Sequence, residues 1–307
     1  MDRREFLKLQ AKLGLMAAAA ASGVGLFSPD DVSSAAVPDI AVAQGPPGAA
    51  VRAAIKVLGG MGRFIKNGDR VVIKPNMSFA EPPESATTTH PEVVAALAAL
   101  CLEAGAFSVL VVDNPLFNPL GCLDTTRIRE ACSSLPRVNV RVLYQEPFFS
   151  EKRIQSGRVL NSTLLMKDVL LADKIIAAPV AKSHTGAGVS LSMKGMMGLV
   201  LDRKAFHRNG LHESIVDLHT VLKADLTVVD ATRVLSSNGP GGPGKILRPG
   251  KVIASADMVA ADAYTTASFD WYGKKYAPRQ VRHLRLAHER GLGRMDIENL
   301  MIKEIRI

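Results

Sequence analysis

The most constraining feature of this chain is a series of short apolar segments separated by segments of helical periodicity. Five of these segments lack the polar–apolar alternation of a strand that has one solvent-exposed face, namely 71–73, 108–112, 174–179, 226–229 and 251–255. The lack of alternation indicates strands that are buried on both faces. Such strands need helices on both faces of their sheet. The pattern therefore predicts an α/β fold, a mostly parallel sheet flanked by helices on both faces in Rossmann-like layers.

The remaining segments complete this prediction. Helices are expected at 48–65, 90–105, 124–134, 190–199, 211–222, 257–270 and 278–290, and further strands at 138–143 and 300–306. No internal repeat or linker follows residue 48, so residues 44–307 are expected to form a single α/β domain. The stretch 114–172 is the expected place for a subdomain or insertion.

The N-terminus carries an export pattern. Arg3 and Arg4 precede Phe-Leu-Lys, a short apolar run spans 13–27, and Ala41-Val42-Ala43 offers a small-x-small cleavage site. Residues 1–43 are therefore predicted to be a twin-arginine signal peptide, which implies a periplasmic or otherwise extracytoplasmic protein and passage through the twin-arginine translocase. An uncleaved signal would leave a membrane anchor, and an ordinary amphipathic helix is the alternative.

The amino-acid composition limits the classes of ligand and partner that are expected. The net charge is +9, which suits anionic ligands, although the basic cluster at 274–294 also fits a solvated helix face. Only 5% of residues are aromatic and the usual nucleic-acid motifs are absent, so no nucleic acid is expected. The three cysteines form no C-x-x-C or ferredoxin pattern. Cys122 and Cys132 are candidates for a disulfide in an oxidising compartment.

Polar side chains follow four of the apolar segments directly. Lys74 and Asn76 follow the first, Asp113 the second, the group Lys182, Ser183 and His184 the third, and Asp230 the fourth. Ligands of open parallel sheets bind beyond the carboxyl ends of the strands. We therefore expect these side chains to share one site, although polar residues at strand ends also occur by chance.

Three further segments contain candidate anion ligands. Thr88 and Thr89 precede a helix, where Thr89 is either a plain N-cap or part of an anion site at the helix start. Lys194 lies in the stretch 182–198, whose hydroxyls, glycines and lysines suit a phosphate or carboxylate without matching a P-loop. Asn238 opens the loop 238–244, which we expect to be a lid or a hairpin.

Histidines permit a metal hypothesis. His184, His212 and a carboxylate such as Asp217 would make a three-ligand site, whereas surface or hydrogen-bonded histidines are the alternative. His212-Glu213 begins like a zinc-protease motif, but Val216 occupies the place of the second histidine.

Several of these motifs together resemble a known family. The segments 72–76, 88–91, 105–106, 179–184, 194–195, 238–240 and 257–262, in this order, are similar to the family catalogued as domain of unknown function 362. The resemblance covers most of residues 68–295. It implies proteins often named as iron–sulfur proteins, some with a ferredoxin module and some with export signals. This chain departs from that pattern because it lacks the ferredoxin cysteines.

Two function classes follow, and a third is weaker. The first is an exported enzyme acting on a small anionic substrate or bound cofactor. In it Lys74 and Lys182 hold the anion, His184 transfers protons, and Asn76, Asp113 and Asp230 orient groups or a metal. The second is a non-catalytic accessory protein that binds a metal or iron–sulfur cofactor and serves a redox partner. A periplasmic solute-binding protein is the third, and it would need two similar lobes.

Overall fold

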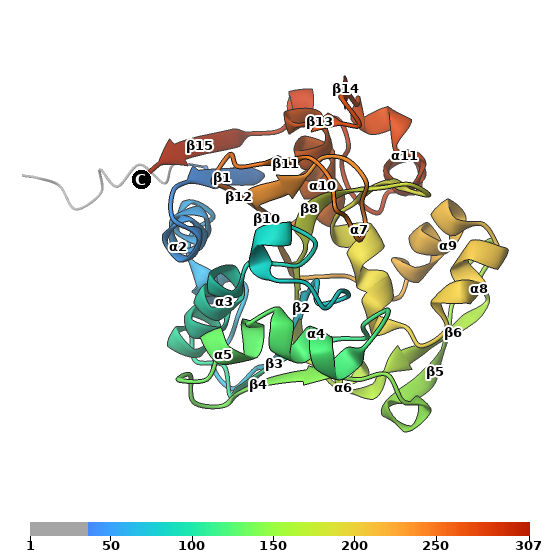
Figure 1. The fold of residues 1–307 in the computed structure, drawn as a ribbon, viewed down its shortest axis with the longest axis horizontal. Helices are drawn as coiled ribbons and strands as arrows, with labels where there is room; N and C mark the ends of the chain where they lie inside the picture. The colour runs from blue at the N-terminus through green and yellow to red at the C-terminus, as the bar shows by residue number, and fades with distance from the viewer. Residues whose placement is uncertain (1–35) are drawn as a thin grey trace, which may run out of the picture. The chain divides into compact units, whose positions relative to one another are not determined.

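One mixed sheet runs through the whole described chain. The computed structural model describes residues 36–307, of which Val37–Ile307 form one compact unit (Figure 1). Within the main row of strands only β12 runs antiparallel to its neighbours, and all other adjacent pairs are parallel. The predicted α/β class with a mostly parallel sheet is therefore confirmed. In spatial order the row is β15 (Ile302–Arg306), β1 (Ile40–Gln44), β12 (Lys251–Ser255), β10 (Leu226–Leu235), β7 (Lys174–Ala178), β2 (Arg70–Pro75), β3 (Ser108–Asp113) and β4 (Val138–Val142).

Each face of the sheet has its own hydrophobic core. In β2, Val71 and Ile73 point to one core and Val72 to the other, which is why the strand has an unbroken apolar run. The first core is covered by α2 (Pro47–Val57), α3 (Pro91–Glu103) and α5 (Ile128–Ala131). The second core is covered by α7 (Ser192–Gly195), α9 (Leu211–Leu218), α10 (Met258–Ser268) and α11 (Arg282–Glu289).

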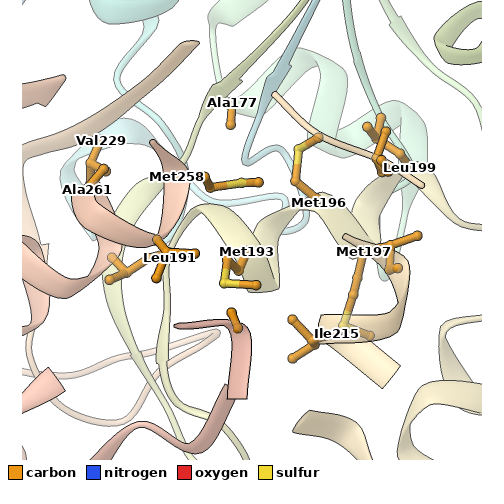
Figure 2. Close-up of a cluster of buried hydrophobic side chains, with 14 of the residues drawn as sticks. Ala177, Leu191, Met193, Met196, Met197, Leu199, Ile215, Val229, Met258 and Ala261 are labelled. Carbon is orange, nitrogen blue, oxygen red and sulfur yellow. The ribbon is translucent and has the colours of Figure 1, made fainter. Parts of the chain in front are cut away.

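Methionines concentrate in the second core. Met193, Met196 and Met197 come from α7 and the 3₁₀ turn Met196–Leu199, and they pack with Met258 of α10 (Figure 2). Met197 and Ile215 of α9 belong to the same core, and both are labelled in Figure 2. These unbranched side chains fill the irregular space around a one-turn helix and hold it against the sheet.

The predicted boundary after Ala43 needs correction. Residues 1–35 lie outside the described part of the chain, but Ile40–Gln44 form β1, which pairs with both β12 and β15. Ile40 to Ala43 are at most 1% exposed. Cleavage after Ala43 would remove four of the five residues of an interior strand, so the folded unit begins upstream, at Val37.

Other segment boundaries shift for local reasons. The helix expected over 48–65 ends early because Gly59 and Gly60 adopt positive φ, and a 3₁₀ turn follows. The stretch 114–172 is not a separate subdomain. It contributes α4 (Pro119–Thr125), α5, the edge strand β4, and a two-stranded ribbon of β5 (Phe149–Arg153) and β6 (Ser162–Met166). A second lobe is absent from residues 37–307, which form the one unit.

The polar segment 182–188, which follows the third apolar segment and was expected to be a loop beyond its strand, is a hairpin. After Pro179 the chain continues as β8 (Val180–His184), turns, and returns as β9 (Gly188–Ser190). β8 also pairs with β10, which extends to Leu235 rather than ending at Val229. The loop 236–245 joins β10 to β11 (Ile246–Leu247) as a hairpin, in line with one of its two predicted forms. Among residues 36–307, none of the helices combines the length and apolarity needed to cross a membrane.

Candidate functional site

A basic pocket lies beyond the carboxyl ends of the central strands. The chain leaves β2 toward β3 and β4 on one side, whereas β7 and β10 lie on its other side, so a switch of direction occurs beside β2. Ligands of open α/β sheets bind at such a point. The pocket has a volume of about 100 Å³. Its lining residues are Asn76, Ser78, Phe79, Leu116, Lys182, His184, Ser190, Lys194, Gly195, Met197, Gly198, Arg203, His207 and Pro240.

The hairpin of β8 and β9 supplies one wall. Because side chains alternate along a strand, Lys182 and His184 share a face of β8. Ser190 lies opposite Lys182 in the ladder and lines the pocket with them. Ser183 has the opposite orientation, and its Oγ accepts a 2.9 Å hydrogen bond from the Gly239 amide. Lys182, Ser183 and His184 are adjacent in sequence and were expected to share the site. Because side chains alternate along β8, Ser183 points away from the pocket.

A buried ion pair lies beneath the pocket floor. Lys74 Nζ is 3.0 Å from Asp113 Oδ1, and both side chains are at most 3% exposed. The Met77 amide donates to Asp113 Oδ2 at 2.7 Å. Gly198 covers the pair so closely that a Cβ there would be 2.2 Å from Asp113 Oδ1. Lys74 and Asp113 therefore compensate one another, and neither is among the residues that line the pocket.

The short helix α7 supplies Lys194. Both carboxylate oxygens of Asp262, on α10, accept 2.9 Å hydrogen bonds from the amides of Ser192 and Met193 at the start of α7. Burial raises the pKa of Asp262 to about 7. Met193 is anchored in the core, and the side chain of Lys194 forms neither a hydrogen bond nor an ion pair within residues 36–307. The ammonium group of Lys194 is thus positioned in the pocket without a protein partner.

Several lining residues were not predicted as site residues from the sequence, among them Arg203, His207 and Phe79. Arg203, from α8 (Arg203–Arg208), donates to the carbonyl oxygens of Asn114 at 2.6 Å and Pro115 at 2.9 Å. His207 lies one turn further along α8, and Phe79 follows β2. No motif marks these residues, because they reach the pocket only through the packing of α8 and the loop after β2.

The pocket has an excess of positive charge. Lys182, Lys194 and Arg203 line it, and no carboxylate does so among the described residues. Burial, and secondarily the charge of Lys194, lower the pKa of Lys182 well below its ordinary value. Burial, with Arg203 and Lys74, lowers the pKa of Lys194 to about 8. Each additional positive charge in the pocket therefore destabilises the folded protein unless an anion is bound there.

His184 is poised as a hydrogen-bond donor. Its Nδ1 accepts hydrogen bonds from the amides of Gly186 at 3.1 Å and Ala187 at 3.2 Å. Burial, and then the charges of Lys194 and Lys182, lower its pKa to about 3. The ring is therefore neutral at pH 7, and with Nδ1 used as an acceptor its proton lies on Nε2.

The two predicted threonines are buried, and neither lines the pocket. Thr89 Oγ1 accepts from the Asn76 amide at 2.9 Å and donates to the Ala178 carbonyl at 2.7 Å. It is not the N-cap of α3, because His90 occupies that position and accepts from the Glu92 amide. Thr88 is buried outside the pocket lining.

Asp230 also stabilises the scaffold. It lies within β10, not after it, and pairs with Arg233 at 2.7 Å while accepting from the His90 amide at 2.7 Å. Asn238 is exposed and donates to Pro243 O at 3.2 Å, whereas Pro240 of the same loop lines the pocket. Neither Asp230 nor Asn238 is in the pocket lining.

The predicted metal ligands do not converge. Asp217 Oδ2 accepts from three consecutive amides, those of Arg158, Val159 and Leu160, and Oδ1 pairs with Arg290 at 2.6 Å. His212 stacks on the buried His283, with ring centroids 5.5 Å apart and Nδ1 atoms 3.3 Å apart. Across residues 36–307 no three His, Cys, Asp or Glu side chains are grouped as metal ligands.

The three cysteines are buried free thiols. Cys122 lies on α4 and Cys132 follows α5, and they form no disulfide. Burial raises the pKa of both thiols to about 11, so neither is a reactive thiolate at neutral pH.

Comparisons with known proteins identify the family. The model of the family described as "Domain of unknown function (DUF362)" matches residues 71–267. A thylakoid-associated protein of Synechocystis is 30% identical over 228 residues, which cover 71% of this chain and 68% of that protein.

Two solved structures show weaker similarity. The lactate racemase apoprotein of Thermoanaerobacterium thermosaccharolyticum matches 71% of this chain and 54% of its own, with 12% identity and a TM-score of 0.43. A Thermotoga maritima protein matches 61% and 51%, with 13% identity and a TM-score of 0.33. This chain thus spans about half the length of each solved structure. On the match of the family model and the Synechocystis relative, the chain belongs to the family described as domain of unknown function 362.

Proposed function

We propose that this protein is an enzyme that binds a small carboxylate or phosphate in the basic pocket. One observation carries the proposal: Lys182, Lys194 and Arg203 line the pocket, and no carboxylate among the described residues lines it with them. Buried charges are normally paired, because an isolated buried charge is expensive. A bound anion would supply the missing partner and would accept hydrogen bonds from Lys194 and from His184 Nε2–H.

The pocket also favours a catalytic role over mere binding of an anion. A lysine whose pKa is lowered well below its ordinary value is available as a base or nucleophile near neutral pH, and Lys182 has this property through burial and its cationic neighbours. The roles change from those expected from sequence. Lys194 and Arg203 hold the anion, His184 donates a hydrogen bond, and Lys74 with Asp113 supports the floor.

Calorimetric titration with inorganic phosphate and with acetate tests the proposal. We expect binding that weakens as salt is raised, because the attraction is electrostatic. Arg203→Met should weaken binding about tenfold or more. Arg208→Met is the matched control, because Arg208 lies on the same helix but is exposed and pairs with Asp202. Equal affinities for the two variants, or no anion binding by the wild type, would contradict the proposal.

We further propose that the folded protein is exported by the twin-arginine route and that cleavage occurs before Val37. The arginine pair at residues 3 and 4 supports export, and the burial of Ile40–Ala43 in β1 supports an upstream cut. Ser34-Ala35-Ala36 also has the small-x-small pattern. N-terminal sequencing of the exported pool should begin at or before Val37, and a start at Gln44 would refute this proposal. A redox partner remains an expectation from the family resemblance.

A further inference from the structure

Lys182 occupies an unusual position for a lysine. It is 1% exposed, yet its side chain lines the pocket. Its Nζ lies 4.5 Å from the centroid of the Phe79 ring and donates a 2.6 Å hydrogen bond to the Thr87 carbonyl. These two contacts fix the amine at the pocket wall. A buried lysine is normally neutralised by a carboxylate.

No carboxylate does so here. Asp113, whose charge acts on Lys182, forms its ion pair with Lys74 at 3.0 Å. Within residues 36–307 Lys182 has no salt bridge, and Lys194 and Lys74 add positive charge around it. Burial and these charges favour the neutral amine. One N–H is engaged by the Thr87 carbonyl, so the amine retains a nitrogen lone pair for another bond.

The same pocket contains receptors for a carboxylate. Lys194 has no protein partner, and Arg203 uses two of its five N–H groups on backbone carbonyls, which leaves three. His184 adds its Nε2–H. A nucleophilic amine beside a carboxylate receptor matches a substrate that carries a carbonyl next to a carboxylate.

We propose that Lys182 is the nucleophile of this site and forms an imine with a small 2-oxo acid whose carboxylate is held by Lys194 and Arg203. This inference rests on the proposed anion site. The amine lone pair attacks the keto carbon, and the carbonyl oxygen takes up a proton to give a carbinolamine. That hydroxyl then leaves as water as the C=N bond forms. The two protons of the water come from the amine, so no oxidant or reductant is needed. Lys194, whose pKa is about 8, can carry a proton between nitrogen and oxygen.

Reductive trapping of the full chain tests the imine. Pyruvate is the probe, cyanoborohydride reduces any imine to a stable secondary amine, and peptide mapping locates the modified lysine. We expect one adduct, at Lys182, formed at least tenfold faster than at the exposed Lys204 and suppressed by excess acetate. Whereas Lys204→Met, at an exposed lysine of α8, should keep the adduct, Lys182→Met should lose it. The wild-type map gives the position even if this variant folds poorly.

The outcomes separate the two proposals. Binding of pyruvate and acetate without an adduct at Lys182 overturns the imine and leaves the anion site standing. Adducts spread over exposed lysines, unaffected by acetate, also overturn it. If phosphate, acetate and pyruvate all fail to bind, the anion site and the imine fall together.

Discussion

Replacing Lys194 with methionine should stabilise the empty protein and weaken its binding of anions. Methionine has a similar length, and the apolar side chains of Leu116 and Met197 already line the pocket. Lys194 has no partner in the described structure, so its charge is a cost of folding until a ligand binds. This cost is the expected price of a preorganised binding site.

The magnitude follows from the pKa of Lys194. Burial lowers it from 10.5 to about 8, and a change of one in pKa corresponds to about 1.4 kcal/mol. The charged form is therefore about 3 kcal/mol less stable in the folded protein than in the unfolded chain. The cost is fully present below pH 8 and disappears as pH rises through 10.5, because the amine is then neutral in both states. After allowance for imperfect packing of the new side chain, we expect Lys194→Met to gain about 1–3 kcal/mol at pH 7.

Urea unfolding at pH 7 and at pH 10 measures this difference. The stability gap between variant and wild type should be largest at pH 7 and should shrink at pH 10. Lys204→Met is the matched control, because Lys204 is exposed on α8, and we expect it to change stability by less than about 0.5 kcal/mol. Saturating phosphate should stabilise the wild type, by about 2.7 kcal/mol at a concentration 100 times Kd, and should stabilise Lys194→Met less. A variant that is less stable than the wild type at pH 7, or a gap independent of pH, would refute the reasoning.

Three further predictions concern the support of the pocket. Gly198→Ala should lower the free energy of unfolding by about 3–5 kcal/mol, measured with urea, because its Cβ would collide with the ion pair of Asp113. Gly62→Ala is the control and should be nearly neutral, because a Cβ there meets nothing within 4 Å. Asp262→Asn should lower the free energy of unfolding by about 1–3 kcal/mol, because an amide accepts only one of the two hydrogen bonds from the backbone amides of α7. It should also weaken phosphate binding in calorimetry, and an unchanged affinity would contradict the role of Asp262 in positioning Lys194. His184 has a folded pKa of about 3 against 6.5 unfolded, so its stabilising effect is present above pH 6.5 and is lost as pH falls, by about 2 kcal/mol at pH 5. His184→Asn should therefore show a smaller drop in unfolding midpoint between pH 7 and pH 5, and an equal drop would count against this account.

Local pattern was sufficient for much of the fold. Unbroken apolar segments such as the one at 71–73 predicted strands buried on both faces, and two separate cores confirm it. The segment at 182–188 was mistaken for a loop because Lys182, Ser183 and His184 are polar. A strand that lines a basic pocket has polar residues on both faces, one set for the ligand and one for the neighbouring loop, so its alternation is hidden.

The candidate site, like the fold, could be predicted from the sequence only in part. The strand-end rule found Lys182, His184 and Asn76, and the glycine-rich stretch found Lys194, all of which line the pocket. The rule also selected Asp230, whose partners Arg233 and the His90 amide could not be known before the strands were placed. Polarity at a strand end indicates that a side chain has a polar partner, but does not say whether that partner is a ligand or the protein.

The sequence by itself determined the layers of this protein, because periodicity and burial are local consequences of which residues are apolar. It also determined the basic charge and the family motifs. Only the tertiary structure decided which charges compensate each other. Lys74 is paired with Asp113, 39 positions away, whereas Lys194 lacks a protein partner, although both are lysines beside glycine-rich or polar segments. The physical reason is that Coulomb interactions depend on distance in space and on burial, and neither can be obtained from spacing along the chain.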